Sequence, residues 1–204
     1  MKKTCEDWKR HFPAGKFGAH FFPEFEMRAK SVSAEVLRVS DAAGAREALL
    51  GLVSDAGART AVVVESPLQE AAGITDALRS RGIGGDTEPA DIAAHADTAD
   101  IGISGVGFGV AETGSVFQDG YDIATRLITI LPPLHVVFLA SENIVPGIEE
   151  AFEVIAPGFE RGYVGLITGP SRTGDIERVL TIGVHGPSRF AIIAVDGDGK
   201  GGDA

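Results

Sequence analysis

Runs of β-branched and aliphatic residues alternate along this chain with stretches of helical periodicity, and this rhythm restricts the fold more than any other feature. Residues 59–64 (Arg-Thr-Ala-Val-Val-Val) form a near-continuous apolar run, typical of a strand buried on both faces of a parallel sheet. Before it, Asp41 is placed to cap a helix through residues 45–53, which Gly57 ends. A strand–helix repeat of this kind predicts a parallel sheet with right-handed crossovers.

The same periodicities predict further elements along the chain. Strands are expected at residues 34–39, 99–104, 134–139, 163–168 and 189–195, with the run at 163–168 buried. Helices are expected at 67–78, around 91–96 and from about 147 to 155. Residues 99–104 and 110–117 predict two short strands, and the bend between them is made by the glycine-rich residues 105–109. They do not indicate a dinucleotide site, because no helix follows the glycines.

The chain has 204 residues, which suits one α/β domain with an appended arm. We expect an N-terminal arm at residues 1–30, the α/β domain at 31–196 and a solvated tail at 197–204. The arm is basic and holds five of the eleven phenylalanines. Exposed aromatic side chains in that number are costly. The arm is therefore expected to pack on its own domain or a twin subunit, or else to dock on a different protein.

Charge and cysteine content exclude several classes of function. The net charge of −11 repels phosphate backbones and anionic lipid, so no nucleic-acid partner is expected. No apolar run approaches the roughly 18–20 residues of a membrane span, and the N-terminus lacks the apolar core of a secretory signal, so a cytoplasmic location is expected. With Cys5 as the one cysteine, this chain alone forms no disulfide, cysteine-ligated iron–sulfur cluster or structural zinc site, and no cofactor of its own is expected.

The residues after the predicted strand at 163–168 are small and polar, and they form the first candidate site. Ligands of open α/β sheets collect beyond strand ends. Gly169, Ser171, Arg172 and Thr173 offer two hydroxyls, a guanidinium and glycine-freed backbone N–H groups, as an anion clamp would. Asp175 lies in the same candidate site. In the alternative interpretation it neutralises Arg172 locally.

A second candidate segment places polar groups in an otherwise apolar hairpin, where burial without partners is costly. Its residues are Glu112, Thr113, Gly114 and Ser115, and the last three, together with Arg126, are candidate anion-binding residues. Either Glu112 pairs internally with an arginine such as Arg126, or it faces a cleft as an acid, a base or a nucleophile.

Two histidines have different expected roles. His185 lies in a loop between glycines and a proline, expected near the clamp, and is the better acid–base candidate. His135 lies within an apolar strand and is expected to be a hydrogen-bonded core histidine.

Four segments in this order together resemble the signature set of the LUD-domain family. They are residues 111–115 (Ala-Glu-Thr-Gly-Ser), 131–135 (Leu-Pro-Pro-Leu-His), 169–177 and 183–187 (Gly-Val-His-Gly-Pro). The resemblance runs from about residue 32 to 195 and implies a three-layer α/β/α sandwich of the NagB/RpiA/CoA-transferase type with a mainly parallel sheet. It also implies a role in bacterial oxidation of L-lactate to pyruvate, alongside partner subunits that carry iron–sulfur clusters.

Two functional hypotheses follow. In the first, the chain is a non-redox subunit of a lactate-oxidising system and binds a small carboxylate, another anion or a partner near Arg172. In the second, it is a free-standing CoA-transferase-like or sugar-phosphate-isomerase-like enzyme that uses Glu112 and His185, by analogy at the level of the fold. A third possibility is that the chain is an interaction scaffold, in which case the aromatic arm would project from the body of the domain. A homo-oligomer is compatible with each hypothesis.

Overall fold

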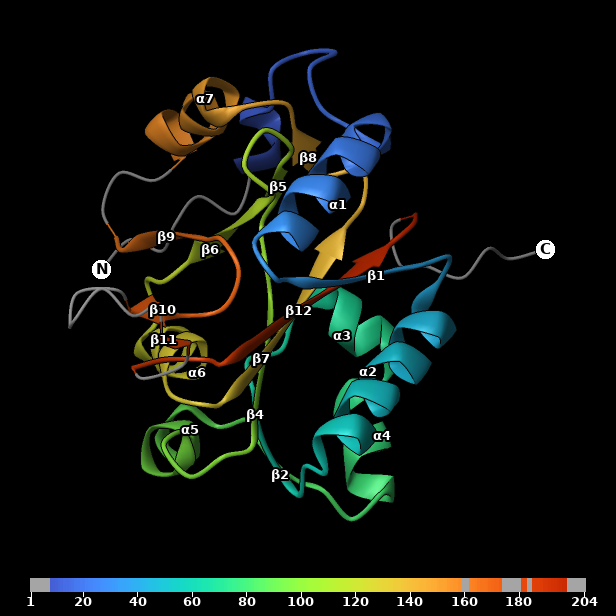
Figure 1. The fold of residues 1–204 in the computed structure, drawn as a ribbon, viewed down its shortest axis with the longest axis vertical. Helices are drawn as coiled ribbons and strands as arrows, with labels where there is room; N and C mark the ends of the chain where they lie inside the picture. The colour runs from blue at the N-terminus through green and yellow to red at the C-terminus, as the bar shows by residue number, and fades with distance from the viewer. Residues whose placement is uncertain (1–7, 159–161, 174–180, 183–184, 198–204) are drawn as a thin grey trace.

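The computed structural model describes residues 8–158, 162–173, 181–182 and 185–197. Its centre is a six-stranded sheet in the order β1-β12-β7-β4-β2-β3, with every neighbouring pair parallel (Figure 1). In sequence order the strands are β1 (Glu35–Val39), β2 (Thr60–Val63), β3 (Gly84–Asp86), β4 (Ile101–Gly105), β7 (Leu134–Ala140) and β12 (Arg189–Val195). The predicted parallel α/β architecture is confirmed.

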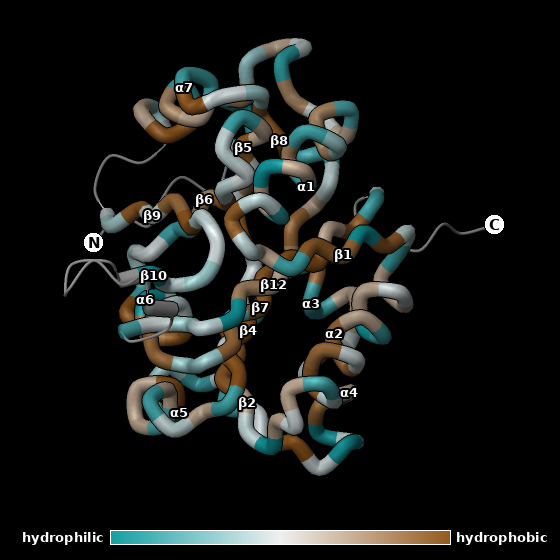
Figure 2. Tube along the Cα trace, viewed as in Figure 1, coloured by the Kyte–Doolittle hydropathy of each residue, from teal (hydrophilic) through white to brown (hydrophobic). Residues whose placement is uncertain are grey.

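Helices cover both faces of this sheet (Figure 1). One face packs against α2 (Ala42–Ala56), α3 (Pro67–Ala72) and α4 (Ile74–Ser80). The other face meets α1 (Phe22–Ser31), α5 (Pro89–His95) and α6 (Ile123–Ile130). The central strands are the most apolar part of the chain (Figure 2), and all seven residues of β7 are buried. This burial is what β-branched strands without a polar face require.

A second, smaller sheet lies on the α1 side of the central one and has the order β8-β5-β6-β9. Its strands are β5 (Gly109–Val110), β6 (Ser115–Asp119), β8 (Ile144–Val145) and β9 (Val164–Ile167). β9 pairs antiparallel with β6 and forms the edge of this sheet. Two short strands, β10 (Arg172–Thr173) and β11 (Thr181–Ile182), form an antiparallel pair. The helix α7 (Ile148–Gly158) follows β8.

Local signals explain the helix boundaries and one difference from the predicted elements. Asp41 Oδ1 accepts a hydrogen bond from Gly44 N at 2.8 Å, and Gly57 ends α2 in the left-handed region with φ 61°, as predicted. The single helix predicted at 67–78 is in fact two, because Gly73 adopts φ 62° between α3 and α4. A left-handed residue cannot continue a right-handed helix.

The strand predicted to be buried at residues 163–168 is instead half-exposed. Val164 and Leu166 each keep 38% of their surface accessible. The cause is position, since β9 is an edge strand of the smaller sheet and not a strand of the central sheet. A strand at an edge with one covered face alternates between covered and exposed side chains.

The described part of the N-terminal arm packs on its own chain. Phe22 and Phe25, on α1, are at most 2% exposed and belong to a core cluster with β7 and β12. Phe12 and Phe17 stack with ring centroids 4.4 Å apart and pack against Phe108 and its neighbours. Residues 8–30 therefore pack on their own domain, which is one of the alternatives expected for the arm. Within the described ranges, every helix is too short or too polar to serve as a membrane span.

Candidate functional site

A pocket of about 270 Å³ opens beside the amino ends of β7 and β12, and we call it the His185 pocket. Its walls come from α6, β9, the segment after β9 and the loop before β12. The lining residues are Thr129, Ile130, His135, Leu166, Ile167, Gly169, Ser171, His185, Gly186, Pro187 and Phe190. The sequence predicts a ligand site beyond the end of a strand. The polar segment does follow a strand end, but it is the end of β9, and the pocket lies at the opposite, amino edge of the central sheet.

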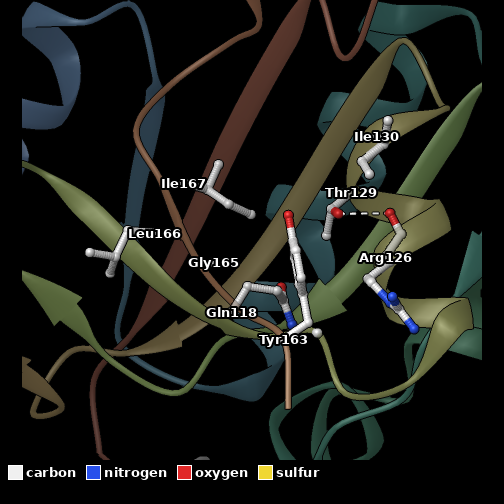
Figure 3. A pocket seen from close by; sticks show the side chains of 9 residues that line it. Gln118, Arg126, Thr129, Ile130, Tyr163, Gly165, Leu166 and Ile167 are labelled. Atoms are coloured by element: carbon white, nitrogen blue, oxygen red, sulfur yellow. Dashed lines mark hydrogen bonds between the residues drawn. The ribbon is translucent and has the colours of Figure 1, made fainter. Parts of the chain in front are cut away.

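A second pocket of about 200 Å³ adjoins the first, and we call it the Arg126 pocket (Figure 3). The two pockets share Thr129, Ile130, Leu166 and Ile167, so they form one groove between α6 and β9. The remaining lining residues are Gln118, Gly120, Arg126, Tyr163 and Gly165. We refer to both pockets together as the α6–β9 groove.

Arg126 supplies positive charge to this groove. Its guanidinium carbon lies 5.6 Å from the centroid of the Tyr163 ring (Figure 3), within the range of a cation–π contact. Among the described residues, its buried Nε has no hydrogen-bond partner. Of the two alternatives for Glu112, the pair with Arg126 is wrong, because Glu112 bonds to Ile148 N. A guanidinium with an unused buried donor, beside an open pocket, is suited to bind an anion.

The segments around Ser171 and His185 meet in space, although these two residues are 14 positions apart in the sequence. Ser171 N donates to Pro187 O at 2.8 Å. A Cβ on Gly186 would come within 2.9 Å of Ser171 Cβ, so this approach requires a glycine. His185 is exposed at the rim, whereas Gly169 and Ser171 line the wall. The His185 loop therefore lies beside the polar segment that contains Gly169 and Ser171, as predicted.

Arg172 does not face the pocket. Its Nη2 donates to Val32 O at 2.6 Å and to Ser33 Oγ at 3.1 Å, and it lines neither half of the groove. The side chain ties β10 to the end of α1, and this overturns its predicted role as the centre of the clamp. The side chain of Thr173 and the whole of Asp175 lie outside the described residues, so the local pairing predicted for Arg172 and Asp175 does too.

Glu112 contacts the N-terminus of α7. Its Oε2 accepts a hydrogen bond from Ile148 N at 3.0 Å, at the first residue of α7. A carboxylate at a helix N-terminus satisfies an unused N–H group and complements the helix dipole. Glu112 lines neither pocket. Glu112 and His185 therefore do not share either of these two pockets. The expectation that they lie in a common catalytic cleft is not met.

The rest of the Glu112 segment is a tight turn beneath α1. Gly114 has φ 67°, and a Cβ there would collide with the backbone of Ala29. Ser115 Oγ and Thr168 Oγ1 are 2.6 Å apart, and Thr113 Oγ1 accepts from Ser115 N at 3.3 Å. Gly114 thus seats the turn against α1, whereas Ser115 bonds to Thr113 and to Thr168 at the end of β9. These three predicted binding residues line neither pocket.

For His135 the expectation from the sequence is incomplete. It is hydrogen-bonded in the core as expected, with Nε2 3.0 Å from Ser104 Oγ, yet it also lines the His185 pocket. Burial lowers the pKa of the imidazole from 6.5 to about 3. The Phe190 ring lies against it, with centroids 5.5 Å apart.

Gln118, Thr129 and Tyr163 were not among the predicted site residues. One signal was present for Gln118, a polar residue within the apolar run of β6. The positions of Thr129 and Tyr163 depend on the packing of α6 against β9, which no local pattern encodes. Among the described residues, no group of three or more His, Cys, Asp or Glu side chains is arranged to hold a metal ion.

Comparisons with known proteins agree with this fold. A family model described as the LUD domain matches residues 22–195, a span that begins with α1. Lactate utilization protein C 1 of Bacillus mycoides is 36% identical over 108 residues, which cover 50% of this chain and 45% of that protein. Lactate utilization protein C of Deinococcus radiodurans is 33% identical over 110 residues, or 53% of this chain and 52% of the relative.

The chain spans about half the length of the curated relatives it matches. A crystal structure of a DUF162-family protein from Deinococcus radiodurans has a TM-score of 0.59 at 24% identity. It covers 88% of this chain and 98% of that one. This likeness extends over nearly the whole architecture and shows the shared α/β fold.

Proposed function

The chain belongs to the LUD-domain family, and from this we propose that it acts in bacterial L-lactate utilisation as a subunit without a redox centre of its own. The names of its curated relatives support the lactate assignment. Oxidation of L-lactate to pyruvate releases two electrons and two protons. In this proposal iron–sulfur clusters on partner subunits would accept the electrons and water would take up the protons, while this chain contributes recognition of the substrate.

The observation that carries the binding role is the unused donor of Arg126 in the α6–β9 groove. The protein has a net charge of −11, so an anion approaches favourably only where positive charge is concentrated. Arg126 supplies that charge, and the Ser171 hydroxyl lies in the adjoining half of the groove. We therefore place the proposed carboxylate site at Arg126 in preference to Arg172, whose guanidinium is engaged with the end of α1.

The surroundings of the groove suit a subunit that works against a partner. Large apolar side chains are exposed along α6 and β9, with Ile130 48%, Tyr163 57% and Leu166 38% accessible. All three also line the groove. An apolar surface around a binding site is typical of protein–protein contact. In this proposal an iron–sulfur subunit covers the groove and brings its cluster to the bound substrate.

Growth on L-lactate tests the proposal. A deletion strain of the native host is complemented with the wild-type gene, with Arg126→Gln and with Arg81→Gln, an exposed arginine at the end of α4. We expect the wild type and Arg81→Gln to restore growth, and Arg126→Gln to fail at equal protein level. Normal growth of the deletion strain on L-lactate would refute the lactate role. Restored growth with Arg126→Gln would refute the anion site.

Co-purification of the tagged chain from lactate-grown cells tests the partner. The expected result is an associated protein with iron and acid-labile sulfide in the eluate. Recovery of the chain without iron-containing protein, under conditions in which lactate is being consumed, would contradict a role as a subunit of an iron–sulfur system.

A further inference from the structure

We propose that His135 recognises a hydroxyl group of the ligand at the floor of the His185 pocket, so that the groove selects hydroxycarboxylates over carboxylates without a hydroxyl. This inference rests on the carboxylate site proposed above. It assigns a specificity-determining contact to a residue that the fold alone would place in the core. Three observations carry it, namely a fixed tautomer, an unused acceptor and the continuity of the two pockets.

Hydrogen bonds behind His135 fix its tautomer. Gln118 Nε2 donates to Gly105 O at 3.2 Å and to Asp119 O at 3.4 Å, which turns Gln118 Oε1 toward Ser104. The Ser104 hydroxyl donates its single hydrogen to Gln118 Oε1 at 3.1 Å. Ser104 Oγ, 3.0 Å from His135 Nε2, can therefore only accept from that nitrogen. Nε2 carries the proton, and Nδ1 has a free lone pair.

The free lone pair has no partner among the described residues. His135 is 0% exposed, and its Nδ1 is buried without a hydrogen bond, although the residue lines the pocket beside Ser171 and His185. Buried polar atoms are nearly always satisfied, so an orphan at a pocket wall calls for a ligand or water group that completes it. Because burial holds the pKa of His135 at about 3, the imidazole is neutral near pH 7 and accepts a hydrogen bond there.

An acceptor of this kind does not attract a carboxylate, which has no hydrogen to donate. It fits a hydroxyl or an N–H group. The carboxylate is then held in the other half of the groove, where Arg126 has its unused donor, and the two halves share Thr129 and Ile130. In this proposal one ligand carries both a carboxylate for Arg126 and a hydroxyl for His135. Because the lactate role proposed above supplies a hydroxyl and not an N–H group, the chemical class is a small hydroxycarboxylic acid.

Calorimetric titration of the full chain with L-lactate and with propionate tests this directly. Propionate keeps the carboxylate and carbon skeleton and lacks the hydroxyl. We expect wild-type protein to bind L-lactate about tenfold more tightly than propionate, the usual worth of one well-formed hydrogen bond. In His135→Gln the amide can still donate to Ser104 but has no group at the Nδ1 position. We expect this variant to bind L-lactate as weakly as propionate.

A spectroscopic readout on wild-type protein keeps the test independent of the variant's folding. In ¹⁵N spectra of the imidazole, His135 should show a protonated Nε2 and an unprotonated Nδ1. Saturating L-lactate should shift the Nδ1 resonance, and saturating propionate should leave it in place. Equal affinity for the two ligands, or an unchanged Nδ1 resonance, would overturn the role of His135 and leave the carboxylate site standing. Binding of neither ligand would overturn the carboxylate site and this inference together.

Discussion

Acid should destabilise this protein through His135, and the size of the effect follows from the pKa in the folded state. Burial lowers that pKa from 6.5 to about 3. Below pH 6.5 the unfolded chain binds a proton at this imidazole, whereas the folded chain does not until the pH approaches 3. Stability is therefore fully present above pH 6.5 and is lost as the pH falls through this window. The slope is about 1.4 kcal/mol per pH unit, or about 2 kcal/mol between pH 7 and pH 5.

Urea unfolding at pH 7, 6 and 5 measures this loss. The matched protein is His135→Gln, which keeps a donor for Ser104 and has no group that titrates at this position. The wild type should lose about 2 kcal/mol more than the variant between pH 7 and pH 5. Contributions from all other groups cancel in the difference between the two proteins. Parallel pH dependence of the two unfolding free energies would refute the reasoning, because it would mean that the imidazole is protonated as easily in the folded as in the unfolded state.

Three substitutions, one of them with a matched control, test the contacts that were reassigned by the structure. Gly114→Ala should lower the unfolding free energy by about 2–4 kcal/mol, since it adds a collision with α1 to an unfavourable φ. The control is Gly51→Ala, in an open position of α2, which should raise the unfolding free energy by about 0.5–1 kcal/mol. Equal effects of the two substitutions on the unfolding free energy would show that α1 does not pack on the turn at Gly114. Arg172→Ala should cost about 1 kcal/mol in urea unfolding, because an exposed side chain loses two hydrogen bonds; unchanged stability would mean that β10 is not held to α1. Glu112→Gln should cost about 0.5 kcal/mol at the start of α7 and leave L-lactate affinity unaltered, whereas loss of binding would return Glu112 to the site.

Local patterns predicted the central sheet well because its signals are local. Residues 59–64 and 134–139 are apolar runs, and the cap at Asp41 and the stop at Gly57 each act within one turn of α2. The helix α6 was not predicted, although Asp122 Oδ1 accepts from Ala124 N at 3.0 Å at its start. The apolar run 127–131 is compatible with a buried strand or with a buried helix. Only packing against β4 and α5 decides between them.

The site was harder to predict because long-range contacts assign its side chains. Glu112 caps a helix that begins 36 residues later, and Arg172 bonds to a carbonyl 140 residues earlier. No periodicity encodes such pairs. The sequence predicts the polar segment at the carboxyl edge of the central sheet. Because β9 belongs to the edge of the second sheet, the segment lies at the amino edge of the central sheet instead. The proximity of Ser171 to the His185 loop was predicted, whereas the contribution of His135 and Gln118 became visible only with the hydrogen bonds through Ser104.

Chemical-shift mapping with L-lactate tests the carboxylate site most directly. The uniformly ¹⁵N-labelled chain is titrated with L-lactate, and the amide signals of Thr129, Gly169 and Ser171, which line the groove, are compared with that of Gly51 on α2. We predict saturable shifts at the three groove positions, no shift at Gly51, and loss of the shifts in Arg126→Gln. Shifts that are absent, that spread to α2, or that persist undiminished in Arg126→Gln would contradict a carboxylate site in the α6–β9 groove.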